Sequence, residues 1–214
     1  MNESQLDRIA DALAADGYGV FDNVLPISLL RGLLTDFNGM DAAAFRSAGI
    51  GRQDDFRLQD KVRSDQIHWL EGVNPATTEF LQTMDSLRHG LNRRLFLGLI
   101  DYESHFAYYP VGAFYKKHLD AFKEKKPLTR VANNSLPHQN FNRVISTVVY
   151  LNENWQSDEG GELVIYNDAD NAVVKKIVPL LGRMVIFLSD RFPHEVLPAQ
   201  RVRISIAGWF RATC

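Results

Sequence analysis

The stretch that decides the fold is residues 182–210, GRMVIFLSDRFPHEVLPAQRVRISIAGWF. It holds two strand-length runs rich in β-branched and aromatic residues, and the polar, proline-containing segment between them is typical of a turn. Similar short runs recur from about residue 100 onward, namely HFAYYP, AFYKKHLD, NRVISTVVYLN, GGELVIY and AVVKKIVP. About seven or eight short strands without an alternating helical pattern predict a jelly-roll or barrel rather than a parallel α/β sheet.

The first hundred residues show helical periodicity instead. The three candidate helices are residues 3–16, 26–37 and 77–99. Gly17 is a suitable stop for the first of them. The polar segment 49–72 between the second and third helices is predicted to be a rim loop that leads into a short strand or hairpin. The class is therefore α+β and mainly β, with helices in residues 1–100 that support a β core in residues 101–214.

Size and composition set further limits. The chain has 214 residues, of which 45% are hydrophobic, so residues 1–214 are expected to form one domain. The 24 Lys+Arg nearly balance the 26 Asp+Glu, which gives no reason to expect nucleic acid or a membrane as a partner. A single cysteine, Cys214, and the lack of a secretion signal or a membrane-length apolar run predict a soluble, cytoplasmic protein.

A candidate metal site starts from His118 and Asp120 in KKHLDAF. On a strand, residues two apart leave the same face, so both side chains could reach one ion while Leu119 points into apolar packing. Chance supplies such a pair often, and a surface strand with two polar residues is the simpler interpretation of the pair alone. A second histidine, His194, completes the two-His, one-carboxylate triad that leaves open positions on Fe(II). Structural zinc, the rival, would need a fourth protein ligand.

The final strand indicates a cosubstrate. Alternation along RVRISIAGWF places Arg203, Ser205, Ala207 and Trp209 on one face and Ile204, Ile206 and Phe210 on the other. A buried arginine needs an anionic partner, and the small residues beside Arg203 leave room for a ligand. A guanidinium binds a carboxylate through two hydrogen bonds, which suits 2-oxoglutarate. The alternative partner is a protein carboxylate, such as Glu162 or Glu195. Tyr150 and Tyr109 could donate hydroxyls to the same anion, although buried tyrosines are often only core residues.

These residues resemble a known family, the prolyl-4-hydroxylase branch of the Fe(II)/2-oxoglutarate-dependent oxygenases, in particular the hypoxia-factor prolyl hydroxylases and their bacterial relatives. The resemblance covers about residues 60–211 and rests on VRSDQIHWLEG, YYP followed by HLD, STVVYLNENW, GGELVIY and SDRFPHEVLPAQRVRISIAGWF. It implies a double-stranded β-helix, a cupin-like jelly-roll. It also implies the site residues, which are iron ligands His118, Asp120 and His194, and 2-oxoglutarate ligands Arg203 and Tyr150 with Tyr109 nearby.

The resemblance further implies the reaction and its partners. Fe(II), 2-oxoglutarate and O2 would be required, with ascorbate as an optional addition, and a prolyl residue in a protein or peptide would be hydroxylated with release of succinate and CO2. The segment from Arg63 to Trp69 and the loop after Asp120 would help to bind that substrate. The insertion at 123–140 is longer than in the animal enzymes, so the substrate-facing rim is not transferred residue by residue. The lysine-rich segment 116–130 could form a lid, although a solvated loop is the simpler interpretation.

Three alternatives stay open at this point. A hydroxylase of a free amino acid or other small molecule would share every ligand and differ only at the rim. A nucleic-acid demethylase of the same superfamily would want a basic, aromatic surface, for which the balanced charge gives little support. A non-enzymatic jelly-roll binding or sensor module would not need open positions on the metal.

Overall fold

The helical periodicity of the first hundred residues produces three α-helices in the computed structural model, which describes residues 1–48, 62–121 and 141–213. The helices are α1 (Glu3–Ala15), α2 (Ile27–Asn38) and α3 (Pro75–Leu95), and a short 3-10 helix, η1 (Ala42–Ala44), follows α2. Beyond α1, Gly17 adopts a left-handed φ of +79°, as expected for a glycine that stops a helix. The three predicted helices are therefore confirmed.

Helix α3 ends earlier than its periodicity predicts. The predicted helix ran to Leu99, whereas α3 ends at Leu95 and is followed by left-handed conformations at Phe96 and Gly98. The side chain of Asn92 forms hydrogen bonds of 2.8 Å with both the backbone N–H and the carbonyl of Leu99, so Leu99 leaves the helix and begins a strand. Leu99 is buried in the same core as the helix, which explains why an apolar pattern alone could not locate the helix end.

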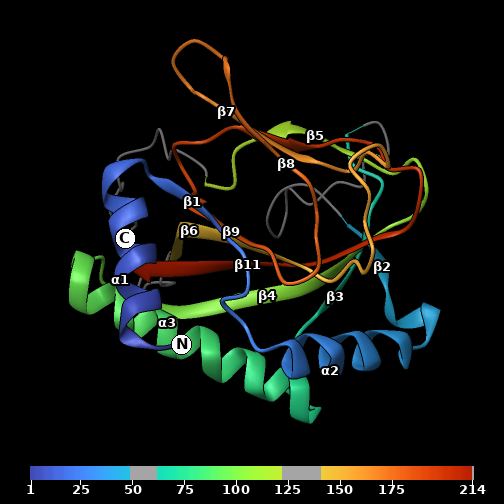
Figure 1. The fold of residues 1–214 in the computed structure, drawn as a ribbon, viewed down its shortest axis with the longest axis horizontal. Helices are drawn as coiled ribbons and strands as arrows, with labels where there is room; N and C mark the ends of the chain where they lie inside the picture. The colour runs from blue at the N-terminus through green and yellow to red at the C-terminus, as the bar shows by residue number, and fades with distance from the viewer. Residues whose placement is uncertain (49–61, 122–140, 214) are drawn as a thin grey trace, which may run out of the picture.

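The strands form two antiparallel sheets (Figure 1). The larger sheet has the order β1-β9-β6-β11-β4-β3-β2, with bounds Tyr18–Phe21, Met184–Leu188, Phe141–Tyr150, Arg203–Thr213, Leu99–Tyr109, Gln66–Trp69 and Arg46–Ser47. The smaller sheet has the order β5-β10-β7-β8, with bounds Tyr115–His118, His194–Val196, Leu163–Tyr166 and Val173–Ile177. Every pairing between these described strands is antiparallel, which confirms the predicted mainly β jelly-roll class.

Strands β1, β2 and β10 were not predicted from the sequence. They have four, two and three residues, which is too short for an alternating pattern to stand out. Strand β1 pairs with β9 from Tyr18↔Phe187 to Phe21↔Met184 and so extends the larger sheet. These strands are defined by their pairing partners rather than by their own residues.

Alternation along β9 separates the two layers of the core. Met184 and Ile186 join a cluster that includes apolar residues of all three helices, whereas Val185 and Phe187 join a second cluster with residues of the smaller sheet. The helices therefore cover one face of the larger sheet, and the smaller sheet lies over the other face (Figure 1). The space between the two sheets is lined mainly by strand residues, together with the short segments that flank β3 and β5, and this is where the predicted site residues lie.

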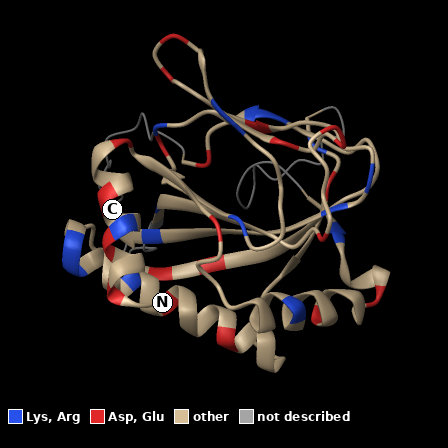
Figure 2. Ribbon diagram, viewed as in Figure 1, with Lys and Arg blue, Asp and Glu red and all other residues tan. Residues whose placement is uncertain are grey.

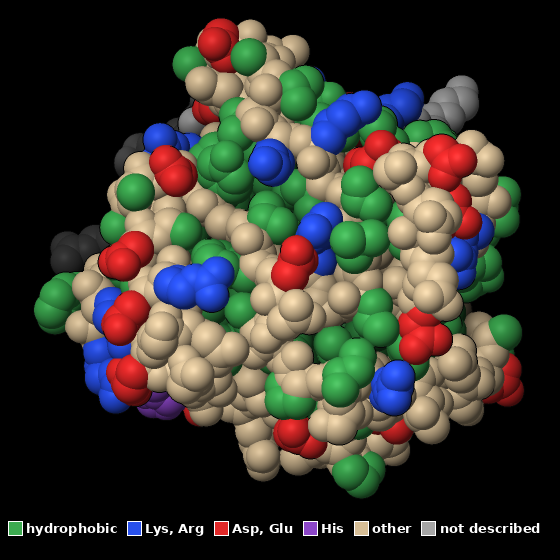
Figure 3. Space-filling view, viewed as in Figure 1, with side chains coloured by type: hydrophobic (Ala, Val, Ile, Leu, Met, Phe, Trp, Pro, Cys, Tyr) green, Lys and Arg blue, Asp and Glu red, His purple; other side chains and the backbone are tan. Residues whose placement is uncertain are grey.

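Acidic and basic side chains are interspersed along the chain (Figure 2), and the face shown in Figure 3 carries no large patch of one charge. No helix in the described parts of the chain is long and apolar enough to cross a membrane. The predicted insertion at 123–140, and with it most of the predicted lid, lies outside the described residues. The single-domain organisation and the cytoplasmic location stay predictions.

Candidate functional site

Three candidate metal ligands converge in a pocket of about 740 Å³ that is lined by residues of both sheets. His118 ends β5, and His194 begins β10 directly opposite it in the antiparallel ladder. The Nε2 atom of His118 lies 3.5 Å from Oδ1 of Asp120, and the Nε2 atom of His194 lies 3.6 Å from Oδ2 of the same carboxylate. One donor atom from each residue lies within 4.8 Å of the others, so a single ion could contact all three.

Asp120 reaches this position by a route that differs from the prediction. Strand β5 ends at His118, so the two residues do not share a face of one strand. The chain instead turns toward the larger sheet, where the backbone N–H of Ala121 donates to the carbonyl of Ser189. The Leu119 prediction is wrong, because this side chain is half-buried and lines the pocket rather than the apolar core. The three candidate ligands thus lie where the end of β5 in the smaller sheet meets the end of β9 in the larger sheet.

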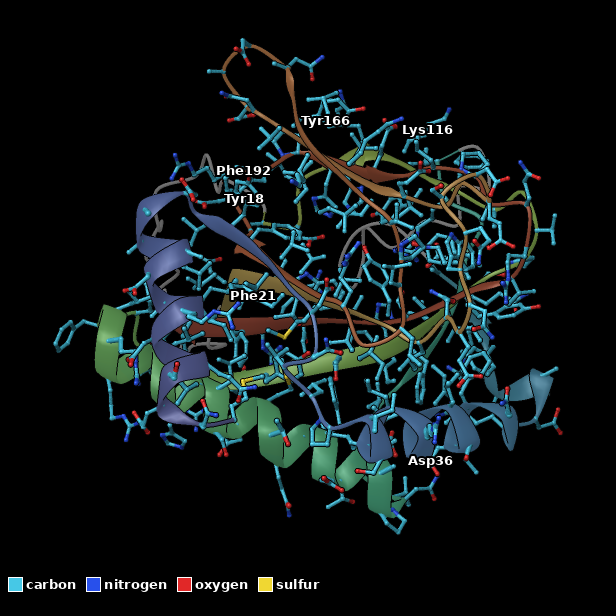
Figure 4. The ribbon with its side chains drawn as sticks, viewed as in Figure 1. Tyr18, Phe21, Asp36, Lys116, Tyr166 and Phe192 are labelled. Atoms are coloured by element: carbon cyan, nitrogen blue, oxygen red, sulfur yellow. The ribbon has the colours of Figure 1, made fainter. Side chains whose placement is uncertain are left out.

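Backbone carbonyls orient the two imidazoles. The Nδ1 atom of His118 lies 2.8 Å from the carbonyl oxygen of Lys116, and that of His194 lies 2.9 Å from the carbonyl oxygen of Phe192. A carbonyl can only accept, so each Nδ1 carries the proton and each Nε2 presents its lone pair to the centre of the group. Phe192 is itself held by an edge-to-face contact with Tyr18 of β1 (Figure 4). The short, unpredicted strand β1 therefore supports the segment that orients a ligand.

The electrostatics of the group favour metal binding. Burial raises the pKa of the Asp120 carboxyl, but the neighbouring imidazoles of His194 and His118 and the hydroxyl of Ser146 outweigh it, so the pKa lies well below its ordinary value. Burial, and then the proximity of His118, lowers the pKa of His194 to about 4. At neutral pH the carboxyl is therefore ionised and this imidazole neutral, which are the forms that coordinate a metal.

One serine holds the carboxylate of Asp120, and a second serine contacts the first. The Ser146 hydroxyl on β6 donates to Oδ2 of Asp120 at 2.7 Å, and it lies 2.9 Å from the hydroxyl of Ser189. Both serines are buried, so their hydrogen bonds do not compete with bulk water. Hydrogen bonds of this kind orient a ligating carboxylate. Neither serine was predicted, although the alternation of β6 places Ser146 on the same face as Val148 and Tyr150.

Arg203 lies where the alternation of the last strand predicts, with its side chain in the pocket and 1% of its surface exposed. Its Nε donates to the carbonyl of Gly161 at 2.9 Å and its Nη1 to the hydroxyl of Ser205 at 3.2 Å. Within the described ranges it forms no ion pair, and neither Glu162 nor Glu195 is its partner; Glu195 instead accepts a hydrogen bond from Tyr166. The alternative of a protein carboxylate is thus not supported.

The two predicted tyrosines flank this guanidinium. The Cζ atom of Arg203 lies 4.8 Å from the ring centre of Tyr109 and 5.0 Å from that of Tyr150. Among the described residues no acceptor is found for the buried Tyr150 hydroxyl. Burial raises the pKa of Tyr150 against the opposing effect of the nearby Arg203, so the hydroxyl stays protonated and able to donate. A buried charge without an anion beside an unsatisfied donor fits a small carboxylate ligand.

Other pocket residues are paired charges and aromatic rings on the larger sheet. Arg143 donates to Glu103 at 2.9 Å, and its guanidinium carbon lies 3.5 Å above the ring of Trp209. The His105 ring lies between Trp69 and Trp209, with ring-centre distances of 5.1 and 5.4 Å. Alternation predicted that Trp209 shares the face of Arg203, but the pairings of the other residues need the register of neighbouring strands.

The protonation of His105 gives a stability prediction. Burial, followed by the positive charge of Arg63, lowers the pKa of His105 from 6.5 to about 4. Between these two values the unfolded chain binds the additional proton, so the free energy of unfolding falls as the pH falls through that window. We expect the free energy of unfolding, measured with urea, to fall less in His105→Gln than in the wild type when the pH is lowered from about 7 to about 5. Equal losses in both proteins would contradict the assignment.

The fold and this pocket define a class of protein, the jelly-roll proteins in which two histidines and one carboxylate face an open cavity, the ligand set of non-haem iron oxygenases. The sequence profile of the 2OG-Fe(II) oxygenase superfamily matches residues 104–211, which include all three candidate ligands and Arg203. The chain therefore belongs to the 2OG-Fe(II) oxygenase superfamily.

Two similar proteins with solved structures are named prolyl hydroxylases. The chain is similar to a Pseudomonas putida prolyl-4-hydroxylase, with 38% identity, a TM-score of 0.79, and coverage of 97% of this chain and 98% of that one. It is also similar to a Trichoplax adhaerens prolyl hydroxylase solved in complex with a hypoxia inducible factor peptide fragment, with 28% identity, a TM-score of 0.77, and coverage of 97% and 89%.

A relative known from its sequence is the hypoxia-inducible factor prolyl hydroxylase of Caenorhabditis elegans, which is 32% identical over 223 residues. The match covers 95% of this chain but only 28% of the worm protein. The chain thus spans less than a third of the length of that relative.

Proposed function

We propose that this chain is an Fe(II)- and 2-oxoglutarate-dependent dioxygenase that hydroxylates a prolyl residue in a protein or peptide. The observation that carries the proposal is the convergence, in one pocket, of the His118, Asp120 and His194 donors with the buried Arg203, which lacks a described carboxylate partner. A non-enzymatic binding module would have no use for a three-donor group that leaves metal positions open to a pocket.

The chain's own residues would hold iron and cosubstrate in defined ways. His118 and His194 would bind iron through Nε2, because their Nδ1 atoms are occupied by backbone carbonyls. Asp120 would supply the carboxylate ligand, held in place by Ser146. The chemistry supplied by the bound iron is the oxidative decarboxylation of 2-oxoglutarate to succinate and CO2, coupled to hydroxylation of a C–H bond with O2.

Arg203 and Tyr150 would anchor 2-oxoglutarate. A guanidinium binds a carboxylate strongly in a low-dielectric pocket, and the Tyr150 hydroxyl, which has no partner in the described structure, would donate to the same group. Tyr109 also lines the pocket, with its ring centre 4.8 Å from Cζ of Arg203, and would contact the ligand. Because Arg203 is almost fully buried, its desolvation is already complete before the ligand binds.

The substrate part of the proposal rests on the relatives, which are named prolyl hydroxylases and include a complex with a peptide. The paired charges and tryptophans on the larger sheet give the pocket a polar and aromatic side suited to a peptide segment. A free amino acid or other small molecule is the second candidate, since it would use the same donors. A cytoplasmic location and a benefit from ascorbate belong to the same proposal.

The experiment is incubation of the purified chain with Fe(II), 2-oxoglutarate and a proteome from a soluble cell extract, followed by mass spectrometry of peptides. We expect a one-oxygen addition on a proline that requires Fe(II) and 2-oxoglutarate together. Synthetic peptides around that proline, with a matched peptide carrying alanine at the position, then test the site directly. Hydroxylation of free proline without any modified peptide would refute the protein-substrate proposal and favour the small-molecule candidate.

A further inference from the structure

We infer that Tyr115, Arg63 and Asp65 form a stack that positions His118, so that metal binding and the ordering of residues 62–65 stabilise each other. The inference rests on the proposed metal site. The three residues are positioning residues in this assignment, because each acts on the metal only through the orientation of His118.

The stack starts with an unusual contact between two residues of one strand. The rings of Tyr115 and His118 are almost parallel, with an interplanar angle of 14° and centres 3.5 Å apart. Residues three apart on a regular strand point to opposite faces, so this contact requires an irregular β5. The register supplies it, because His194 pairs with His118 whereas Val196 pairs with Tyr115, so that β5 carries one residue more than β10. This β-bulge places the Tyr115 side chain on the same face of β5 as His118.

The other face of the Tyr115 ring is covered by a cation. The guanidinium carbon of Arg63 lies 4.2 Å from the ring centre. Asp65 fixes this guanidinium through two hydrogen bonds, of 2.8 Å from Nε and 2.6 Å from Nη2 of Arg63. The Asp65 side chain has no exposed surface, so the ion pair is not screened by bulk water. The order of contacts is therefore Asp65, Arg63, Tyr115, His118.

Backbone hydrogen bonds run parallel to the stack. The N–H of Lys116 donates to the carbonyl of Val62 at 2.8 Å, and the N–H of Ser64 donates to the carbonyl of Phe114 at 3.0 Å. Residues 62–64 thus lie along the free edge of β5. The carbonyl of the same residue, Lys116, accepts the hydrogen bond from Nδ1 of His118. A displacement of Val62 would therefore move Lys116 and, through it, the imidazole of His118.

The segment also joins the two sheets. Arg63 bridges to β5 of the smaller sheet, and three residues later the chain enters β3 of the larger sheet at Gln66. Arg63, Asp65 and Tyr115 all line the pocket that contains the metal donors. Because the stack fixes the orientation of His118, the order of residues 62–65 is coupled to metal binding. Such a coupling is reciprocal by thermodynamic linkage. Metal binding should therefore order residues 62–65, and substitutions that loosen these residues should lower the affinity for the metal.

The test uses the full chain, Mn(II) as the metal probe under calorimetry, and amide hydrogen exchange of the peptide covering residues 62–69. We expect Mn(II) to slow exchange in this segment in the wild type but not in His118→Ala. Tyr115→Leu should weaken Mn(II) binding about tenfold, and Asp65→Asn by a similar factor, the usual effect of removing support for a ligand. Tyr115→Phe keeps the ring and should bind Mn(II) within about twofold of the wild type.

Asp22→Asn is the matched control. It breaks another Asp–Arg pair, formed with Arg183 at 2.7 and 2.9 Å, which does not line the pocket, and it should leave Mn(II) affinity and the exchange of residues 62–69 unchanged. Should Tyr115→Leu not fold, Asp65→Asn and the exchange measurement decide alone. Wild-type Mn(II) affinity in Asp65→Asn, or exchange in residues 62–69 that ignores Mn(II), would overturn the inference. Neither readout involves turnover, so a failure of the proposed function would be seen separately.

Discussion

Replacement of His118 by alanine is expected to reduce succinate formation from 2-oxoglutarate by more than about 100-fold, because loss of a residue that merely supports a ligand already costs about 10- to 100-fold. His118 ends β5 and is only partly buried, so its truncation leaves no large cavity. The remaining pair, Asp120 and His194, would supply two protein donors in place of three. Succinate should be measured with Fe(II) present and absent, since the wild type should depend on it and the variant should not respond.

The matched control for this prediction is His89→Ala. His89 is an exposed histidine on α3, where it lies 3.4 Å from Asp85, and it does not line the pocket. The control should form succinate at the wild-type rate. If His118→Ala retained turnover while its Mn(II) binding was also intact, the proposed ligand set would be wrong. If the wild type bound metal but released no succinate, the metal site would stand and the oxygenase activity would not.

The sequence predicted elements whose own residues carry a repeating pattern. The eleven residues of β11 alternate clearly enough to place Arg203 and Trp209 on the pocket face and Phe210 in the helix-covered core. Helices α1, α2 and α3 have apolar stripes and were found with small errors at their ends. Strand β10 has three residues and no pattern of its own, although it carries His194. Its existence depends on pairing with β5 and β7, which are distant in the sequence.

The sequence named the three residues that come together in the candidate metal group, but it did not predict their geometry, and their role as ligands stays a prediction. Sequence spacing brought His118 and Asp120 together for a reason that the structure does not support, because Asp120 lies beyond the end of β5. The directly opposed pairing of His118 and His194 depends on a register that no local pattern encodes. The same holds for the β-bulge that stacks Tyr115 on His118, since an extra residue in one strand is defined only against its partner.

Replacement of Arg203 by methionine is expected to separate cosubstrate binding from both metal binding and folding. Truncating one partner of a buried charge pair costs about 2–5 kcal/mol, so kcat/KM for 2-oxoglutarate should fall by about 30-fold to several thousand-fold. Mn(II) affinity should not change, because Arg203 contacts none of the three donors in the described structure. The matched control is Arg201→Met, a half-buried arginine two residues away that does not line the pocket. It pairs with Glu159 at 3.4 Å, and the variant should keep wild-type kinetics.

The stability of the same variant tests why Arg203 is buried. Without ligand, the guanidinium is held by a carbonyl and a hydroxyl but by no described carboxylate, so the fold bears the desolvation of a charge that lacks its anion. Methionine removes that cost along with two hydrogen bonds. The free energy of unfolding of the ligand-free variant should therefore lie within about 1 kcal/mol of that of the wild type. With Mn(II) present, 2-oxoglutarate should raise the Tm of the wild type and leave that of the variant unchanged. A strongly destabilised variant that still responds to 2-oxoglutarate would mean that Arg203 serves the fold, and that the carboxylate is bound elsewhere in the pocket.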